Sequence, residues 1–353
     1  MSLSPEHAIL LRRHAAEAEQ RGELHPEVLA LVYNEQWFRC MVPSRFGGLA
    51  LPLPAVVRLE EELSAADGAA GWTITLCSGA GWFTGFFPPS GLDRIFSDPR
   101  MCLAGSGAPD GRAERLAGGG YRVDGRWAYA SGARHATAFT ANCVVCEDGA
   151  PVMGEGGRPL IRPFLFLRGE VQVSTDWKAV GLVATGSHGF SVTGLEAPAE
   201  RAFDIDARVA ADDSPLYRYP FLPLAEATLA VNCSGMARHF LACFEQLFSA
   251  RVARGHVPGD AAAMVQDIYE QAGREVMRAR EAFYAALDAS WAKMSGYEDV
   301  SRTSHVLAVI ARQWVDTLYP YAGLGAANVG SEINRVWRDV HTASQHPLLV
   351  FGK

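Results

Sequence analysis

The spacing of apolar residues changes twice along this chain, and that change constrains the fold more than any single motif. Residues 1–100 and 206–353 repeat apolar side chains at helical spacing, whereas residues 101–205 form short runs punctuated by glycine. Several short strands in about 100 residues favour a small barrel or sandwich. We therefore predict an α+β chain: an N-terminal helical domain over 1–100, a β domain over 101–205 that is either a small barrel or a sandwich, and a C-terminal four-helix bundle over 206–353.

The end of the last predicted helix is unusually polar. It reads WRDVHTASQHP, and Pro347 disfavours helix at the preceding residue, so we expect the helix to end near His346. An imidazole there would lie near the negative end of the macrodipole, which favours its charged form. Arg335 and Asp339 are four residues apart and are expected to pair. Taken alone, these residues favour a polar helix end without a chemical role.

The clearest strand signal is YRVDGRWAYASG, residues 121–132. Asp124-Gly125 between alternating runs predicts a hairpin turn. A period of two places Trp127, Tyr129 and Ser131 on one face, where two rings and a hydroxyl could form a wall for a flat ligand. The residues by themselves favour a plainer interpretation, a half-buried strand with aromatic core side chains.

A second glycine-rich segment, DWKAVGLVATGSHGF, spans residues 176–190. We expect a strand to end at Gly181 and the Thr185-Gly186-Ser187 turn to expose amides and hydroxyls, which can hold an anion or the edge of a ring. An ordinary glycine turn is the simpler explanation. No dinucleotide fingerprint is present, because that motif needs a preceding strand and a following helix.

Several classes of partner are disfavoured by composition. The net charge of −7 disfavours nucleic acid, and the seven cysteines, an odd and sparse set, indicate a reduced, cytoplasmic protein. We predict no metal site, because Cys143 and Cys146 should point to opposite faces of a strand. His341 and His346 are five residues apart rather than the four of a zinc helix.

No membrane segment is expected. Residues 68–92 carry no charge and are long enough to span a bilayer, but their glycines, prolines and hydroxyls favour a buried helix and turn. The first 20 residues are charged and helical and lack the apolar run of a signal peptide.

Five ordered segments together resemble the acyl-CoA dehydrogenase superfamily. More narrowly, they are similar to its flavin-dependent monooxygenase branch, the group D oxygenases of two-component systems. The segments are VPSRFGG (42–48), LEEELSAADGAAGW (59–72), GGGYRVDGRWAYASGARHA (118–136), DWKAVGLVATGS (176–187) and NRVWRDVHTASQH (334–346).

This resemblance implies a fold with an N-terminal helical domain, a central β-barrel and a C-terminal four-helix bundle. It also implies a cofactor and roles for particular residues. Flavin is expected between the barrel and the bundle, with the Ser131 hydroxyl near its N5 and with His346 facing the substrate. Catalytic roles therefore fall to His346 and Ser131, and Trp82 is a second expected substrate contact. The expected flavin-binding residues are Trp127, Tyr129, Ser131, Trp177, Thr185, Gly186 and Ser187.

The chain lacks one residue that each branch of the superfamily leads one to expect. Dehydrogenases often carry a catalytic glutamate after an Arg-Asp pair, but Arg338-Asp339 is followed here by VHTASQH, which has no carboxylate. A histidine suits hydrogen bonding to a phenol or amine rather than abstraction of an α-proton. Many monooxygenase relatives also carry a histidine at the position that falls near Ala80, so the substrate is left open.

The resemblance implies a homotetramer that receives reduced FMN or FAD from a separate flavin reductase. It would use molecular oxygen to oxidise a small aromatic or amine substrate. Two alternatives stay open at this point: a dehydrogenase or desaturase acting on an acyl thioester, and a flavin-free, non-enzymatic protein of the same fold.

Overall fold

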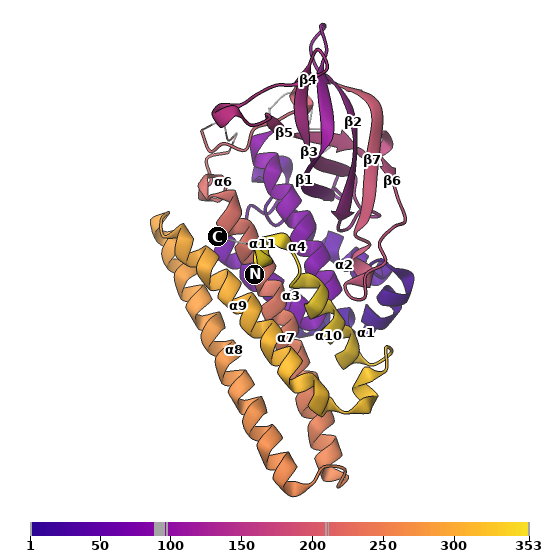
Figure 1. The fold of residues 1–353 in the computed structure, drawn as a ribbon, viewed down its shortest axis with the longest axis vertical. Coiled ribbons are helices and arrows are strands. Elements are labelled where there is room, and N and C mark those ends of the chain that lie inside the picture. Colours follow the sequence, from indigo (N-terminus) through magenta and orange to yellow (C-terminus); the bar gives the residue numbers. More distant parts are fainter. Residues whose placement is uncertain (1, 88–95, 97, 209, 211, 352–353) are drawn as a thin grey trace.

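The computed structural model describes residues 2–87, 96, 98–208, 210 and 212–351. A sheet occupies one end of the molecule, long helices extend to the other end, and the N-terminal helices lie between them (Figure 1). These N-terminal helices are α1 (Pro5–Arg21), α2 (Pro26–Asn34), α3 (Leu53–Ala66) and α4 (Gly68–Trp82).

Local sequence signals set the ends of these helices. Ser4 caps α1, with its hydroxyl accepting from the backbone N–H of His7, and Pro5 is the first helical residue, as the sequence predicts. Asp67 ends α3 and caps α4. The helix predicted within 68–92 is α4, whose side chains are almost all buried; residues 88–92 lie outside the described residues.

The strands form one open sheet rather than the predicted barrel. Its order is β4-β3-β1-β2-β7-β6, with β5 also paired to β3, and only β1 and β3 run parallel. One edge of the sheet is formed by β5 and the two-residue β4, the other by the two-residue β6, and among the described residues these edges do not pair with each other. The strands are β1 (Leu103–Arg115), β2 (Tyr121–Ala130), β3 (Ala138–Glu147), β4 (Ala150–Pro151), β5 (Ile161–Leu167), β6 (Gln172–Val173) and β7 (His188–Ala197).

The hairpin prediction at Asp124-Gly125 is wrong. Both residues lie within β2, and the chain turns instead at residues 116–120. Gly125 pairs with Gly111 of β1, and a Cβ on either glycine would lie within 2.6 Å of the Trp127 ring. Glycine is therefore needed here to make room for an indole, not to turn the chain.

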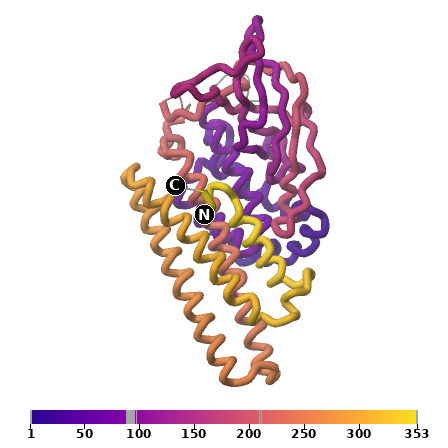
Figure 2. The backbone as a smooth tube through the Cα atoms, viewed as in Figure 1, coloured from indigo at the N-terminus to yellow at the C-terminus, as the bar shows by residue number. Residues whose placement is uncertain are grey.

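The C-terminal helices form a bundle, as predicted. Helices α7, α8 and α9 run side by side, and α10 crosses beside α7 (Figure 2). A buried carboxylate joins the bundle to the N-terminal helices: Glu61 of α3 accepts from Arg280 of α8 at 2.8 Å and from Ser234 of α7 at 2.6 Å. The helices are α6 (Pro215–Arg218), α7 (Phe221–Ala253), α8 (Gly259–Lys293), α9 (Tyr297–Leu318), α10 (Glu332–Ala343) and α11 (Pro347–Val350).

None of the helices in the described part of the chain combines the length and the apolar character that crossing a bilayer requires.

Candidate functional site

The turn over residues 181–187 joins the sheet to helix α10. Leu182 adopts a left-handed conformation, with φ of 51°, and its N–H donates to Asp339 Oδ1 at 2.5 Å. Its carbonyl accepts from Trp177 Nε1 at 3.0 Å and from Thr185 Oγ1 at 2.7 Å. Gly181 is required beside it, because a Cβ there would lie 2.1 Å from the Arg338 carbonyl oxygen. The last long helix therefore fixes the shape of this turn.

Three buried hydroxyls form a chain from this turn to the end of β2. Ser187 Oγ lies 2.6 Å from Thr185 Oγ1 and 2.8 Å from Ser131 Oγ. Thr185 gives its only hydroxyl hydrogen to the Leu182 carbonyl, which can only accept. Ser187 must therefore donate to Thr185, and Ser131 must donate to Ser187. This order leaves Ser131 Oγ with free lone pairs, so it can accept a further hydrogen bond but cannot donate one.

Helix α4 packs directly behind Ser131. The Sγ of Cys77 lies 3.6 Å from the Ser131 carbonyl oxygen. Gly132 has φ of 75°, its N–H donates to the Thr185 carbonyl at 2.8 Å, and a Cβ at this position would lie 2.6 Å from the Cys77 sulfur. The backbone at Ser131 is thereby held between α4 and the turn.

The predicted aromatic wall is wrong in its geometry. Trp127 is fully buried inside the sheet layer, where its ring stacks on Phe190 with centroids 5.2 Å apart. Tyr129 has φ of 64°, lies at a break in the pairing of β2 with β7, and is 74% exposed. The break reverses the alternation, so the two rings do not share a face. Tyr129 instead meets the Trp177 ring edge-on at 6.2 Å.

Trp82, the expected substrate contact, belongs to an aromatic cluster. Its ring lies 4.6 Å from that of Phe86 and 5.6 Å from that of Phe221, and its Nε1 donates to the Leu216 carbonyl at 3.0 Å. It is 1% exposed, so this packing gives the expected contact no support. Ala80, near which the resemblance leads one to expect a histidine, is also buried on α4.

The long helix ends near His346, as predicted, but His346 itself lies at the start of a further short helix. Helix α10 ends at Ala343, and His346 caps α11 because Pro347 is favoured as a first helical residue. Its Nδ1 accepts from the Leu348 N–H at 3.3 Å, and its ring meets Trp72 of α4 edge-on at 6.0 Å. Burial lowers the pKa of His346 to about 4. The imidazole is therefore neutral at pH 7, which corrects the expectation from the macrodipole.

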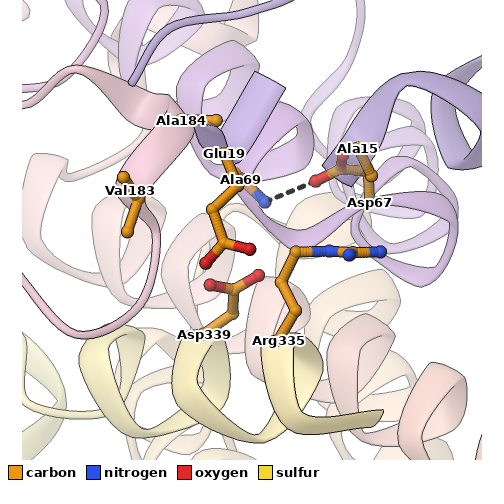
Figure 3. A pocket seen from close by; sticks show the side chains of 8 residues that line it. All are labelled: Ala15, Glu19, Asp67, Ala69, Val183, Ala184, Arg335 and Asp339. Carbon is orange, nitrogen blue, oxygen red and sulfur yellow. Dashed lines mark hydrogen bonds between the residues drawn. The ribbon is translucent and has the colours of Figure 1, made fainter. Parts of the chain in front are cut away.

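A group of carboxyls surrounds Arg335 where α1, α4 and α10 meet (Figure 3). Glu19 and Asp339 face each other in this group, and Asp67 caps α4 with an oxygen 2.8 Å from the N–H of Ala69. Burial, with Asp67 and Glu19 nearby, raises the pKa of Asp339 to about 7, although Arg335 lowers it.

Among the described residues, Arg335 and Asp339 do not form the predicted ion pair. Asp339 accepts from the Leu182 N–H instead. Sequence reasoning missed this anchoring role. The Asp67 cap could have been found, because an aspartate directly before GAAGW is a typical helix start.

Two groups in the described part of the chain bring possible metal-ligand atoms within 4.8 Å of one another. Neither group includes a residue of the hydroxyl chain or His346, and in each a histidine is already paired with a glutamate. The groups are His14, His25 and Glu27, and His239, Cys243 and Glu332.

Comparison with known proteins finds relatives of this chain among flavin enzymes. The family model "Acyl-CoA dehydrogenase, C-terminal domain" matches residues 227–351. A pigment production hydroxylase of Rhodococcus sp. (strain ATCC 21145) is 28% identical over 94% of this chain and 87% of its own. The oxygenase component of the FADH(2)-dependent resorcinol hydroxylase of Rhizobium sp. (strain MTP-10005) is 27% identical over 96% and 88%.

A solved structure shares the fold over nearly the whole chain. The HsaA monooxygenase from M. tuberculosis superposes with a TM-score of 0.87 at 22% identity, covering 98% of this chain and 93% of its own. The chain is therefore similar over residues 227–351 to the acyl-CoA dehydrogenase C-terminal domain, is similar over nearly its whole length to hydroxylases, one of them FADH(2)-dependent, and shares the fold of a monooxygenase.

Proposed function

We propose that this chain is the oxygenase component of a two-component flavin-dependent monooxygenase acting on a small aromatic substrate. The observation that carries the proposal is the hydroxyl chain that ends in the accepting Ser131 oxygen, between the sheet and α4. Two relatives that cover most of this chain are named as hydroxylases, one of them as the oxygenase component of a resorcinol hydroxylase. No residue after Arg338-Asp339 supplies the carboxylate base of a dehydrogenase.

The residues present fit a reduced flavin. A reduced flavin ring presents N–H donors, and Ser131 Oγ is an acceptor with no hydrogen to give. The ring would be held from the sheet side by Thr185, Gly186 and Ser187. The Trp177 and Tyr129 rings, which meet edge-on, would lie on the outside of the same turn. When bound, the flavin supplies the electrons and the activation of oxygen, which protein side chains cannot provide.

His346 is suited to orient the substrate. Its Nδ1 already accepts a hydrogen bond from the Leu348 N–H, so the neutral ring carries its hydrogen on Nε2. That Nε2–H is a donor for the oxygen of a phenol or the nitrogen of an aromatic amine. A neutral donor binds such a group without requiring a second charge to be buried.

Partners, oligomeric state and cellular location follow from the proposed function. A separate flavin reductase would supply reduced FMN or FAD, and molecular oxygen would be the second substrate. We infer a homotetramer. We also infer a cytoplasmic location, which the seven free cysteines support.

Turnover under isotopically labelled oxygen tests the function. The protein would be combined with a general flavin reductase, NADH, FMN or FAD, and a panel of phenols, indoles and aromatic amines. The proposal expects one oxygen atom from ¹⁸O₂ in the product. Bleaching of bound oxidised flavin by acyl-CoA thioesters without oxygen, with no labelled product from the panel, would instead indicate a dehydrogenase.

A further inference from the structure

The helix that begins at His346 is too short to be stable alone. Helix α11 has four residues, and isolated helices of that length do not persist in water. It lies against α7 and α9 (Figure 1), and Leu349 is its buried side chain. The position of the His346 ring therefore depends on the contacts that α11 makes with the bundle.

The peptide groups of Leu348 connect the bundle to the His346 ring. The Leu348 N–H donates to His346 Nδ1 at 3.3 Å. The Leu348 carbonyl oxygen accepts from Nε2 of His305, on α9, at 2.8 Å. One residue is thus bound from two sides, by the imidazole that would orient substrate and by an imidazole of the bundle.

A buried carboxylate stands behind His305. Glu226 of α7 is 0% exposed, its Oε1 lies 3.3 Å from His305 Nε2, and neither of its oxygens has a hydrogen-bond partner among the described residues. A carboxylate without water is strongly destabilised unless an opposite charge or a donor is close. The pair therefore favours a hydrogen on His305 Nε2, which is the hydrogen that Leu348 accepts.

We propose that Glu226 and His305 are positioning residues: they hold α11 against the bundle through Leu348 and thereby fix the ring of His346 for substrate binding. The final clause rests on the proposed function, whereas the anchoring of α11 does not. A merely structural role would predict equal destabilisation of the whole bundle when either residue is changed.

The direct test is hydrogen exchange of the protein without flavin in His305→Ala, His305→Gln and Glu226→Gln. We expect amides 348–351 to exchange at least about tenfold faster in His305→Ala, with α7 and α8 unchanged. His305→Gln keeps a donor for the Leu348 carbonyl and should recover part of the protection. Glu226→Gln keeps the shape of the side chain and should show a smaller acceleration in the same segment.

The NMR titration of the His346 ring gives a second readout. Burial now holds the pKa of His346 low, and a freed α11 should let it rise toward its ordinary value in His305→Ala. The matched control is His341→Ala: His341 lies on α10 and pairs with Asp316 at 2.7 Å. We expect that control to leave both the exchange of α11 and the His346 titration as in the wild type.

Two results would overturn the inference. One is unchanged exchange of residues 348–351 in His305→Ala; the other is equal acceleration across α7, α8 and α9. Turnover separates this inference from the proposed function. If α11 is freed but NADH consumption stays coupled to product formation, Glu226 and His305 anchor α11 without positioning His346 for the substrate. Absence of hydroxylation in the wild type would remove the proposed function while leaving the exchange result standing.

Discussion

The order of donation along Thr185, Ser187 and Ser131 determines what the last hydroxyl offers a ligand. Because the Leu182 carbonyl takes the Thr185 hydrogen, each hydroxyl in turn gives its hydrogen away from the position expected for the flavin. The sequence alone does not show in which direction these hydroxyls donate. It is the fixed direction, and not the mere presence of a serine, that suits a ring N–H.

Substitution in this chain should affect flavin and oxygen chemistry more than folding. Ser131→Ala removes the accepting oxygen, and Ser187→Ala frees the Ser131 hydrogen and so breaks the fixed direction. We expect each to weaken binding of reduced flavin by roughly 1–3 kcal/mol and to raise the yield of hydrogen peroxide. Binding titration and peroxide assays measure both effects. Ser191→Ala on β7 is the control, and equal behaviour of all three variants would contradict this account.

His346 should act as a neutral donor over the working pH range. With its pKa at about 4, the ring does not titrate between about pH 6 and 9, so coupling should show no step from His346 there. We expect His346→Ala to keep flavin affinity within severalfold but to consume NADH with more hydrogen peroxide and less product. His346→Asn should recover part of the coupling. Wild-type coupling in His346→Ala would make this residue only a helix cap.

At the scale of elements, the contact between α10 and the 181–187 turn carries a pH dependence. The native state holds a proton on Asp339 up to about pH 7, whereas the unfolded chain releases it near 3.8. The unfolded state therefore binds fewer protons in this window, and this group lowers stability as pH rises from 3.8 to 7. The Leu182 amide still favours an oxygen acceptor at this position at every pH.

Asp339→Asn separates the charge from the hydrogen bond. The amide oxygen can accept from Leu182, and the buried charge is gone, so we expect the variant to gain up to about 4 kcal/mol relative to the wild type between pH 4 and pH 8. Thermal melts at both pH values measure this change. Asp316→Asn, at an exposed position, should show no such change of relative stability with pH. A stability gain of Asp339→Asn that is larger at pH 4 than at pH 8 would contradict the expected burial of a proton on Asp339.

The sequence predicts most elements but not their junctions. The helices at residues 5–21 and 53–82 follow from caps and apolar spacing, and these are local properties. Closure of the sheet is a property of distant edges, and Asp124-Gly125 looks like a turn because only the folded sheet shows the Trp127 ring beside it. The position of His346 was missed for a similar reason, since Pro347 can begin a helix as readily as it can end one.

At the scale of the whole molecule, exposed apolar side chains gather on the bundle. Val306 and Val309 on α9 are 47% and 58% exposed, and Phe351 at the end of α11 is 79% exposed. Helix α11 packs against α9, so these exposed apolar side chains lie on neighbouring elements of the bundle. We expect a second copy of the chain to cover them.

Light scattering at micromolar concentration tests this assembly. The account expects a tetramer, or at least a dimer, and expects Val309→Glu to lower the measured mass because a buried charge is unfavourable at an interface. Ile9→Glu, on α1, is the control. A wild-type monomer would contradict the expectation.

The central claim is that the junction of sheet and helices binds reduced flavin and controls its reaction with oxygen. Anaerobic titration with reduced FMN and FAD, followed by rapid mixing with oxygen, tests it most directly. We predict saturable binding of one of the two, and a transient spectrum that is neither reduced nor oxidised flavin and that is shortened in Ser131→Ala. Oxidation at the rate of free flavin, with no transient and no difference between wild type and Ser131→Ala, would contradict the claim.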